Sequence, residues 1–286
     1  MRNRRSFLAS LAVLPWLAAR AAAAAGLRVA AVDWALAETM IALGHDPVAV
    51  VAASDWNRFV VEPSLPEHVA DLGLQPEINF ELLASLRPDL ILTSPFSQDL
   101  EPGLRRIASV QRFSIFEPGS TPLAQPKTLT RALGVRLGRT DVAERFLADA
   151  ERTFEAYRER IRSRAPRPVL LATFVDARHV RVYGGNGLYQ NVLDRIGLEN
   201  AWTGATNYWG YATMGIERLA INQDLQLIAF EPVPPDIRAT LDRSPLWSNL
   251  PFVKAKRTAV LPSVLMFGAM PAALRFARLL VGHVAP

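Results

Sequence analysis

Short apolar runs alternate with stretches of mixed polarity along most of the chain. The runs are rich in Val, Leu, Ile and Ala, and polar residues, Gly or Pro bound most of them, which is typical of buried β-strands. The predicted strands are 27–32, 47–53, 88–94, 168–174, 225–230 and 258–262. Helical patterns lie between them at 35–43, 80–86 and 272–283. This alternation predicts an α/β fold with mostly parallel sheets.

The middle of the chain has a different pattern. From Asp141 to Arg164, apolar side chains recur at three- and four-residue steps with charged side chains between them. This spacing predicts one long amphipathic helix, with Thr140 as its N-cap and the following "APRP" as its end. An ordinary crossover helix within one domain would show the same periodicity, so the flanking segments must decide between the two interpretations.

The flanking segments contain a weak internal repeat. "FELLASLRPDLILT" (80–93) and "IERLAINQDLQLIA" (216–229) both pass from an apolar residue and Glu to a short helix and a buried strand. Glu81 and Glu217 occupy equivalent places, 217 − 81 = 136 residues apart. The repeat favours two similar lobes (26–139 and 165–286), joined by one long rigid helix (140–164), with a ligand cleft between them.

The first 25 residues have the character of a signal peptide. They carry four Arg and no acidic residue, and a short apolar stretch precedes a run of Ala, which predicts cleavage near Ala25. The pair Arg4 and Arg5 resembles a twin-arginine export signal. Removing this segment leaves 32 − 4 = 28 basic and 27 acidic side chains. A mature protein with so little net charge gives no reason to expect a nucleic-acid partner.

No motif in the sequence supports catalysis or a protein-bound metal. The chain has no Cys, and its four His are far apart: His45, His68, His179 and His283. The nucleophile elbow, the P-loop and the dinucleotide fingerprint are all absent, and the Gly-rich "YGGNG" (183–187) lacks the fingerprint spacing and predicts a turn. The sequence therefore predicts a protein that is not an enzyme.

One segment gathers aromatic residues without helical or strand periodicity. "NYWGY" (207–211) holds Tyr208, Trp209 and Tyr211, with Asn207 and Gly210 between them. Aromatic residues are usually buried, and a place in the core is one interpretation. We favour a loop that presents flat, amphipathic faces to a ligand, because Asn and Gly interrupt the cluster.

Further aromatic residues follow the first two predicted strands. Trp34 comes directly after the first strand, and Trp56 and Phe59 come after the second. Since α/β folds bind ligands at the carboxyl ends of their strands, these side chains are expected to meet at the cleft.

Four longer stretches carry a resemblance to a known family: "VDWALAETMIALG", "EPSLPEHVADLGL", "VYGGNGLYQNVLDRIGLENAW" and "TNYWGYATMGIERLA". Together they resemble periplasmic ferric hydroxamate siderophore-binding proteins, whose two lobes are joined by a rigid helix. The resemblance implies a monomer in the periplasm that delivers a ferric siderophore to an inner-membrane ABC permease dimer. It also implies no cofactor, since the iron arrives inside its chelator.

The resemblance assigns ligand contacts to positions on both lobes. These are Trp34, Phe59, Gln75, Phe96, Ser97, Asn207, Tyr208, Trp209, Leu265 and Phe267. Three of them depart from the family pattern: Gln75 replaces an Arg that bonds hydroxamate oxygens, Phe96 or Ser97 replaces a Tyr with the same task, and Leu265 stands where a Trp is found. Because Gln donates only neutral hydrogen bonds, a cobalamin or haem carrier of the same class is an alternative. A two-lobed chelatase-like enzyme is the alternative from another class.

The two glutamates of the internal repeat have an implied partner. In the resembled proteins, glutamates at these two helix starts meet arginines of the permease, which implies permease docking for Glu81 and Glu217. Each carboxylate would also stabilise the positive end of its own helix, and that alone is an alternative role.

Overall fold

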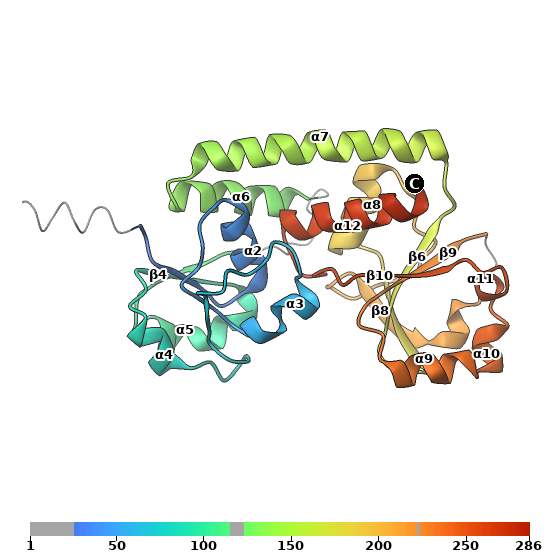
Figure 1. Ribbon diagram of the computed structural model, residues 1–286, viewed down its shortest axis with the longest axis horizontal. Coiled ribbons are helices and arrows are strands. Elements are labelled where there is room, and N and C mark those ends of the chain that lie inside the picture. Colours follow the sequence, from blue (N-terminus) through green and yellow to red (C-terminus); the bar gives the residue numbers. More distant parts are fainter. Residues whose placement is uncertain (1–25, 115–122, 222–223) are drawn as a thin grey trace, which may run out of the picture.

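The computed structural model describes residues 26–114, 123–221 and 224–286. The predicted signal peptide (1–25) lies outside these ranges. The described residues form two lobes, each built around a five-stranded sheet, and a long helix runs along both (Figure 1). The α/β fold with two lobes and a long connecting helix, predicted from the sequence, is therefore confirmed.

The N-terminal lobe holds an entirely parallel sheet in the order β3-β2-β1-β4-β5. Its strands are β1 (Val29–Ala31), β2 (Ala49–Val50), β3 (Ala70–Asp71), β4 (Leu90–Thr93) and β5 (Ser109–Arg112). Its helices are α2 (Trp34–Ala42), η1 (Ala53–Asp55), α3 (Trp56–Phe59), α4 (Phe80–Ser85), η2 (Pro95–Leu100), α5 (Glu101–Leu104) and α6 (Ala124–Arg136). The central strands β1 and β4 are buried throughout, which explains their continuous apolar sequences.

The C-terminal lobe holds a mixed sheet in the order β10-β9-β6-β7-β8. Its strands are β6 (Val169–Phe174), β7 (His179–Tyr183), β8 (Tyr211–Gly215), β9 (Gln226–Phe230) and β10 (Thr258–Leu261). Its helices are α8 (Leu188–Ile196), η3 (Ile216–Leu219), α9 (Pro235–Asp242), α10 (Pro245–Ser248), α11 (Pro251–Lys254) and α12 (Met270–Val284). Strands β6, β9 and β10 are parallel, as predicted, whereas β7 runs antiparallel to both β6 and β8.

The long helix α7 (Thr140–Arg164) buries one face along both lobes (Figure 1). The buried side chains include Ala143, Leu147 and Phe154, at helical spacing. The prediction of Thr140 as N-cap is wrong, because Arg139 occupies that position and makes no side-chain cap. The tight turn from α6 sets this start: the backbone N–H of Arg139 donates to the carbonyl of Gly134 (2.7 Å).

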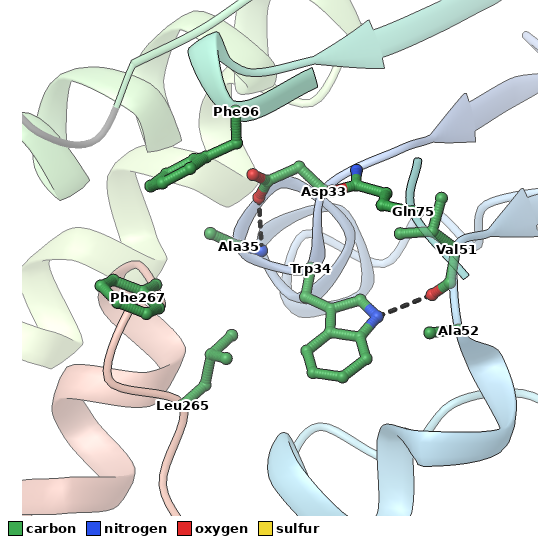
Figure 2. Close-up of a pocket in the computed structure, with 9 residues that line it drawn as sticks. All are labelled: Asp33, Trp34, Ala35, Val51, Ala52, Gln75, Phe96, Leu265 and Phe267. Carbon is green, nitrogen blue, oxygen red and sulfur yellow. Dashed lines mark hydrogen bonds between the residues drawn. The ribbon is translucent and has the colours of Figure 1, made fainter. Parts of the chain in front are cut away.

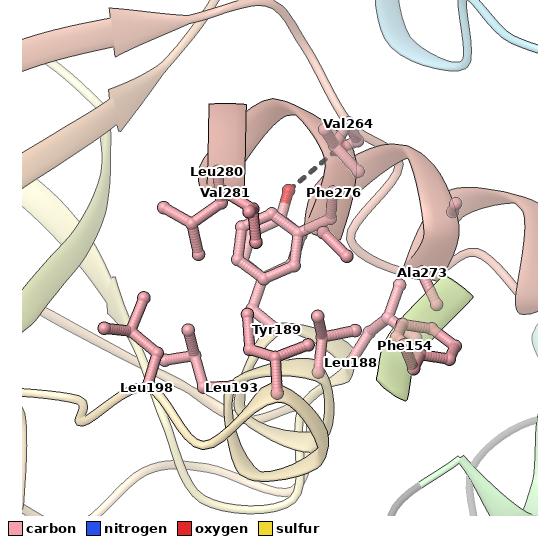
Figure 3. Packing of buried hydrophobic residues seen from close by; sticks show 14 of the residues in the cluster. Phe154, Leu188, Tyr189, Leu193, Leu198, Val264, Ala273, Phe276, Leu280 and Val281 are labelled. Carbon is pink, nitrogen blue, oxygen red and sulfur yellow. Dashed lines mark hydrogen bonds between the residues drawn. The ribbon is translucent and has the colours of Figure 1, made fainter. Parts of the chain in front are cut away.

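The core of the C-terminal lobe lies between the sheet and helices α7, α8 and α12 (Figure 3). Tyr189 is at its centre, packed against Phe276 with ring centroids 4.5 Å apart. The Tyr189 hydroxyl donates to the carbonyl of Val264 (2.8 Å), which satisfies the one polar group of this ring. This bond also fixes the segment after β10, which forms part of the cleft described below.

Helix α12 ties the two lobes together through a buried carboxyl group. Glu38, on α2 of the N-terminal lobe, is fully buried, and its Oε1 accepts from the backbone N–H groups of Ala269 (2.6 Å) and Ala272 (3.4 Å) at the start of α12. Gly268 permits this approach, since a Cβ there would lie 2.9 Å from the Glu38 Oε1 atom.

An ion-pair cluster makes a second connection between the lobes. Glu62, which follows α3, pairs with Arg275 and Arg278 of α12, each at 2.5 Å. The Ser263 hydroxyl also donates to the carbonyl of Phe59 (3.3 Å). The lobes are thus joined by α7, by contacts at α12 and by the segment between β10 and α12, an arrangement that opposes hinge bending.

Burial of Glu38 makes the stability of the protein depend on pH. Burial raises the pKa of Glu38 from 4.5 to about 8, although the two backbone bonds lower it. The folded state therefore keeps a proton that the unfolded chain releases. The contribution of Glu38 to the free energy of unfolding is therefore complete below about pH 4.5 and is lost as the pH rises to about 8.

Replacing Glu38 by Gln removes this titration and keeps a carbonyl oxygen for the Ala269 N–H. We expect the melting temperature of the wild type to fall more between about pH 5 and about pH 8.5 than that of Glu38→Gln. Thermal unfolding followed by circular dichroism measures both. Parallel pH profiles for the two proteins would show that Glu38 does not titrate as described.

Candidate ligand-binding cleft

Two adjoining cavities lie between the lobes. One has a volume of about 340 Å³ and is lined mainly by the N-terminal lobe, and the other has a volume of about 400 Å³ and is lined mainly by the C-terminal lobe. They share Trp34, Leu265 and Phe267, so together they form one cleft. Aromatic and aliphatic side chains dominate its walls, as is usual for sites that take an organic ligand.

The wall from the N-terminal lobe begins at the carboxyl end of β1 (Figure 2). Asp33 caps α2, and its Oδ1 accepts from the backbone N–H groups of Ala35 and Leu36. Trp34 then turns into the cleft, and its indole N–H donates to the carbonyl of Val51 (2.7 Å). With its only polar group satisfied, the ring offers an apolar face.

Of the two aromatic residues predicted after the second strand, only one reaches the cleft. Phe59 lines it and stacks against Trp34, with centroids 6.1 Å apart and an interplanar angle of 27°. Trp56 is fully buried, packs edge-on against Trp34 and donates its indole N–H to the carbonyl of Pro63. The expectation that Trp56 lies at the cleft is wrong, since its polar group has an internal partner.

The "NYWGY" segment is a tight turn followed by strand β8. The Oδ1 of Asn207 accepts from the backbone N–H groups of Trp209 (3.0 Å) and Tyr211 (3.2 Å), so this side chain holds the turn. Gly210 has φ +78°, and a Cβ there would collide with the backbone of Gly187. The two Gly-containing turns therefore pack backbone to backbone, and the predicted turn at 183–187 anchors the aromatic one.

This turn brings Trp209 against aromatic side chains from two other segments. Trp209 stacks on Phe96 of the N-terminal lobe, with centroids 4.7 Å apart and an interplanar angle of 28°. Phe267 lies 5.9 Å from Trp209 and 6.0 Å from Phe96. Three rings from distant parts of the sequence thus meet where the lobes face each other. Tyr208 packs edge-on against Trp209 and is 49% exposed.

Gln75 lines the cleft, but both hydrogens of its side-chain amide have internal partners. The Nε2 atom donates to the carbonyl of Val32 (2.7 Å) and to the hydroxyl of Ser97 (2.6 Å). Since the Val32 carbonyl only accepts, the amide group is fixed in this orientation. The prediction that Gln75 donates to a ligand is not supported by this geometry. Ser97 is buried and holds Gln75 in place.

Three charged side chains line the cleft within the described residues: Asp33, Arg181 and Glu231. Burial raises the pKa of Asp33, and its backbone hydrogen bonds oppose this rise. Arg181 was not predicted from the sequence, because β7 was not recognised as a strand. The alternation of "HVRVY", with Val180 and Val182 buried, is the signal that would have placed Arg181 on the cleft face.

The described residues contain no group of three or more His, Asp or Glu side chains that could hold a metal ion. None of the helices within 26–114, 123–221 and 224–286 combines the length and the apolar character of a membrane span.

Glu81 and Glu217 occupy matching places at the starts of two helices. Glu81 lies in the first turn of α4, where Asn79 is the N-cap, and Glu217 lies in the first turn of η3 after Gly215. Both side chains are exposed, and neither forms an ion pair with a described residue. Helix α4 and helix α10, against which η3 packs, lie on the side of the molecule opposite α7 (Figure 1).

Two sheet-based lobes, a long connecting helix and an aromatic cleft between them define a two-lobed substrate-binding protein. A model of the periplasmic binding protein family matches residues 29–265. The chain belongs to this family of binding proteins and is not an enzyme.

Individual relatives are close in both sequence and structure. The chain is 36% identical over 282 residues to the iron(3+)-hydroxamate-binding protein FhuD of Escherichia coli (strain K12), a match that covers 97% of this chain and 95% of that protein. The crystal structure of FhuD from Vibrio cholerae with bound Fe3+–Desferal superposes with a TM-score of 0.84 at 27% identity, covering 92% of this chain and 100% of that one. FhuD2 from Staphylococcus aureus shares the fold, with a TM-score of 0.71 at 20% identity and coverage of 91% and 98%.

Proposed function

We propose that the protein binds a ferric siderophore, of the hydroxamate type by preference, and delivers it to an inner-membrane ABC permease. The observation that carries this proposal is the apolar cleft closed by Trp34, Phe96, Trp209 and Phe267. Rigid aromatic rings grip the curved organic body of a chelate at a small entropic cost. The names of the two relatives at 36% and 27% identity, which refer to Fe3+-hydroxamate and Fe3+–Desferal, support the same cargo.

The proposal also covers the export of the protein, its location and its docking on the permease. Residues 1–25 act as a signal peptide of the twin-arginine type, and the mature protein works as a periplasmic monomer with lobes 26–139 and 165–286 joined by the helix 140–164. The iron stays within its chelator, so the protein supplies no metal ligand. Glu81 and Glu217 dock the loaded protein on the permease dimer, one carboxylate to each subunit.

A ligand screen tests the proposed cargo. Quenching of intrinsic tryptophan fluorescence is measured while the mature protein is titrated with ferrichrome, a ferric catecholate, haem and cobalamin. We expect saturable quenching by the ferric hydroxamate, with weaker effects from the others, because Trp34 lines the cleft and Trp209 packs against Phe96 and Phe267, which also line it. Quenching by haem or cobalamin alone would identify a different cargo, and no quenching by any iron chelate would refute the proposal.

Replacing Gln75 by Arg tests how the cleft meets the iron-bound oxygens. The guanidinium has enough N–H groups to keep donors to Val32 and Ser97 and to present others to the chelate. We expect about 10-fold tighter binding of ferrichrome, because charge-assisted hydrogen bonds are the stronger ones. Gln75→Met is the matched control and adds no donor. Equal affinities for Gln75→Arg and the wild type would show that position 75 does not face the chelate oxygens.

A further inference from the structure

Arg181 is the one basic side chain that lines the cleft within the described residues. It lies on β7 between the buried Val180 and Val182, so strand alternation turns it to the other face of the sheet. There it pairs in register with Thr173 of β6, which lines the same cavity. The place of Arg181 is therefore set by the sheet, not by a loose surface loop.

The aromatic turn supports the Arg181 side chain. Its Cζ atom lies 5.1 Å from the ring centroid of Tyr211, a cation–π distance, and Tyr211 is held by its backbone bond to Asn207. A guanidinium has five N–H donors, and a cation–π contact with a ring forms no hydrogen bond to an acceptor atom. The Tyr183 hydroxyl nearby is already bonded to Thr173 (2.7 Å).

Arg181 also lacks an internal counter-charge. Glu231 lines the same cavity, yet neither it nor any other described carboxylate forms an ion pair with Arg181. A positive charge of this kind, exposed in an aromatic cleft, is available to an anionic group of a ligand. The opposite wall offers no equivalent group, because the amide hydrogens of Gln75 are bonded to Val32 and Ser97.

We propose that Arg181 is the charged hydrogen-bond donor to the chelate and contacts the anionic oxygens that coordinate the iron. The inference rests on the proposed function, since it assumes that the cargo is a ferric chelate. Hydroxamate, catecholate and carboxylate oxygens all carry negative charge when they bind Fe3+, and a guanidinium donates to two of them at once. In the wild-type protein the charged donor to the cargo thus lies on the C-terminal lobe.

Calorimetric titration of the mature protein with ferrichrome tests this assignment. We expect Arg181→Gln to raise the Kd about 10- to 100-fold, in the range of a lost charged hydrogen bond. Arg181→Lys, which keeps the charge and loses the planar fork, should fall between Arg181→Gln and the wild type. Arg178→Gln is the matched control, because Arg178 is exposed in the turn before β7 and does not line the cleft.

Thermal unfolding of the free proteins separates a ligand contact from a structural role. Because Arg181 is exposed and no described carboxylate forms an ion pair with it, Arg181→Gln should keep the melting temperature of the wild type. The inference is overturned, and the proposed function still stands, if Arg181→Gln binds ferrichrome within about twofold of the wild type, or if its weaker binding comes with a large fall in melting temperature. No binding of ferrichrome to the wild type overturns both.

Discussion

Replacing both Glu81 and Glu217 by Gln is expected to abolish uptake of the ferric chelate, with chelate affinity and melting temperature unchanged. Both carboxylates are exposed at helix starts. Helix α4, which carries Glu81, and helix α10, against which η3 packs, lie on the side of the molecule opposite α7 (Figure 1). A permease dimer with two-fold symmetry would meet one carboxylate in each lobe, and two lost contacts between opposite charges remove most of the specific recognition.

Iron uptake in cells that depend on this protein measures the effect, and purified double mutant serves for affinity and melting. The matched control is Glu144→Gln with Glu159→Gln, two exposed glutamates on α7, far from the proposed docking face. This control should transport normally. Normal transport by Glu81→Gln/Glu217→Gln would remove the docking role and leave stabilisation of the helix starts as the function of these residues.

Replacing Trp209 by Ala should weaken chelate binding by about 1 to 3 kcal/mol, a range typical of a truncated aromatic anchor. Trp209 stacks on Phe96 and faces Phe267, so its removal opens the meeting point of the two lobes. The fold should survive, because Asn207 and Gly210 hold the turn through backbone contacts that do not involve the indole.

Calorimetry with ferrichrome gives the affinity, and thermal unfolding gives the stability. Leu246→Ala, at an exposed apolar residue of α10 outside the cleft, is the control and should leave the affinity unchanged. A large fall in melting temperature for Trp209→Ala, with little change in affinity, would show that Trp209 is a core residue and not a ligand contact.

The elements predicted correctly are those with strong local patterns. The apolar pattern within each of these segments is enough to predict its burial. Examples are the buried parallel strands β4 and β9 and the amphipathic helix α7. Strands β7 and β8 were missed because both are partly exposed, and in β7 the exposed His179 and Arg181 interrupt an otherwise apolar run. Their pairing depends on turns that only the folded chain brings together.

The candidate site was predictable by residue type and less so by individual role. The positions of Trp34 and Phe59 after strands gave the cleft, because the carboxyl ends of parallel strands share one edge. The internal bonds of Trp56 and Gln75 were not predictable, since their partners are backbone carbonyls set by the fold. Whether a polar atom faces a ligand depends on contacts between residues that are far apart in the sequence, such as Gln75 and Val32. A local sequence pattern does not predict such contacts.

A crystal structure of the mature protein loaded with ferrichrome, with data collected at the iron absorption edge, tests the central claim most directly. The account predicts one anomalous iron peak between the lobes, with the chelate enclosed by Trp34, Trp209 and Phe267 and no protein atom bonded to the iron. An iron peak outside this cleft, or iron coordinated by side chains of the protein, would contradict it.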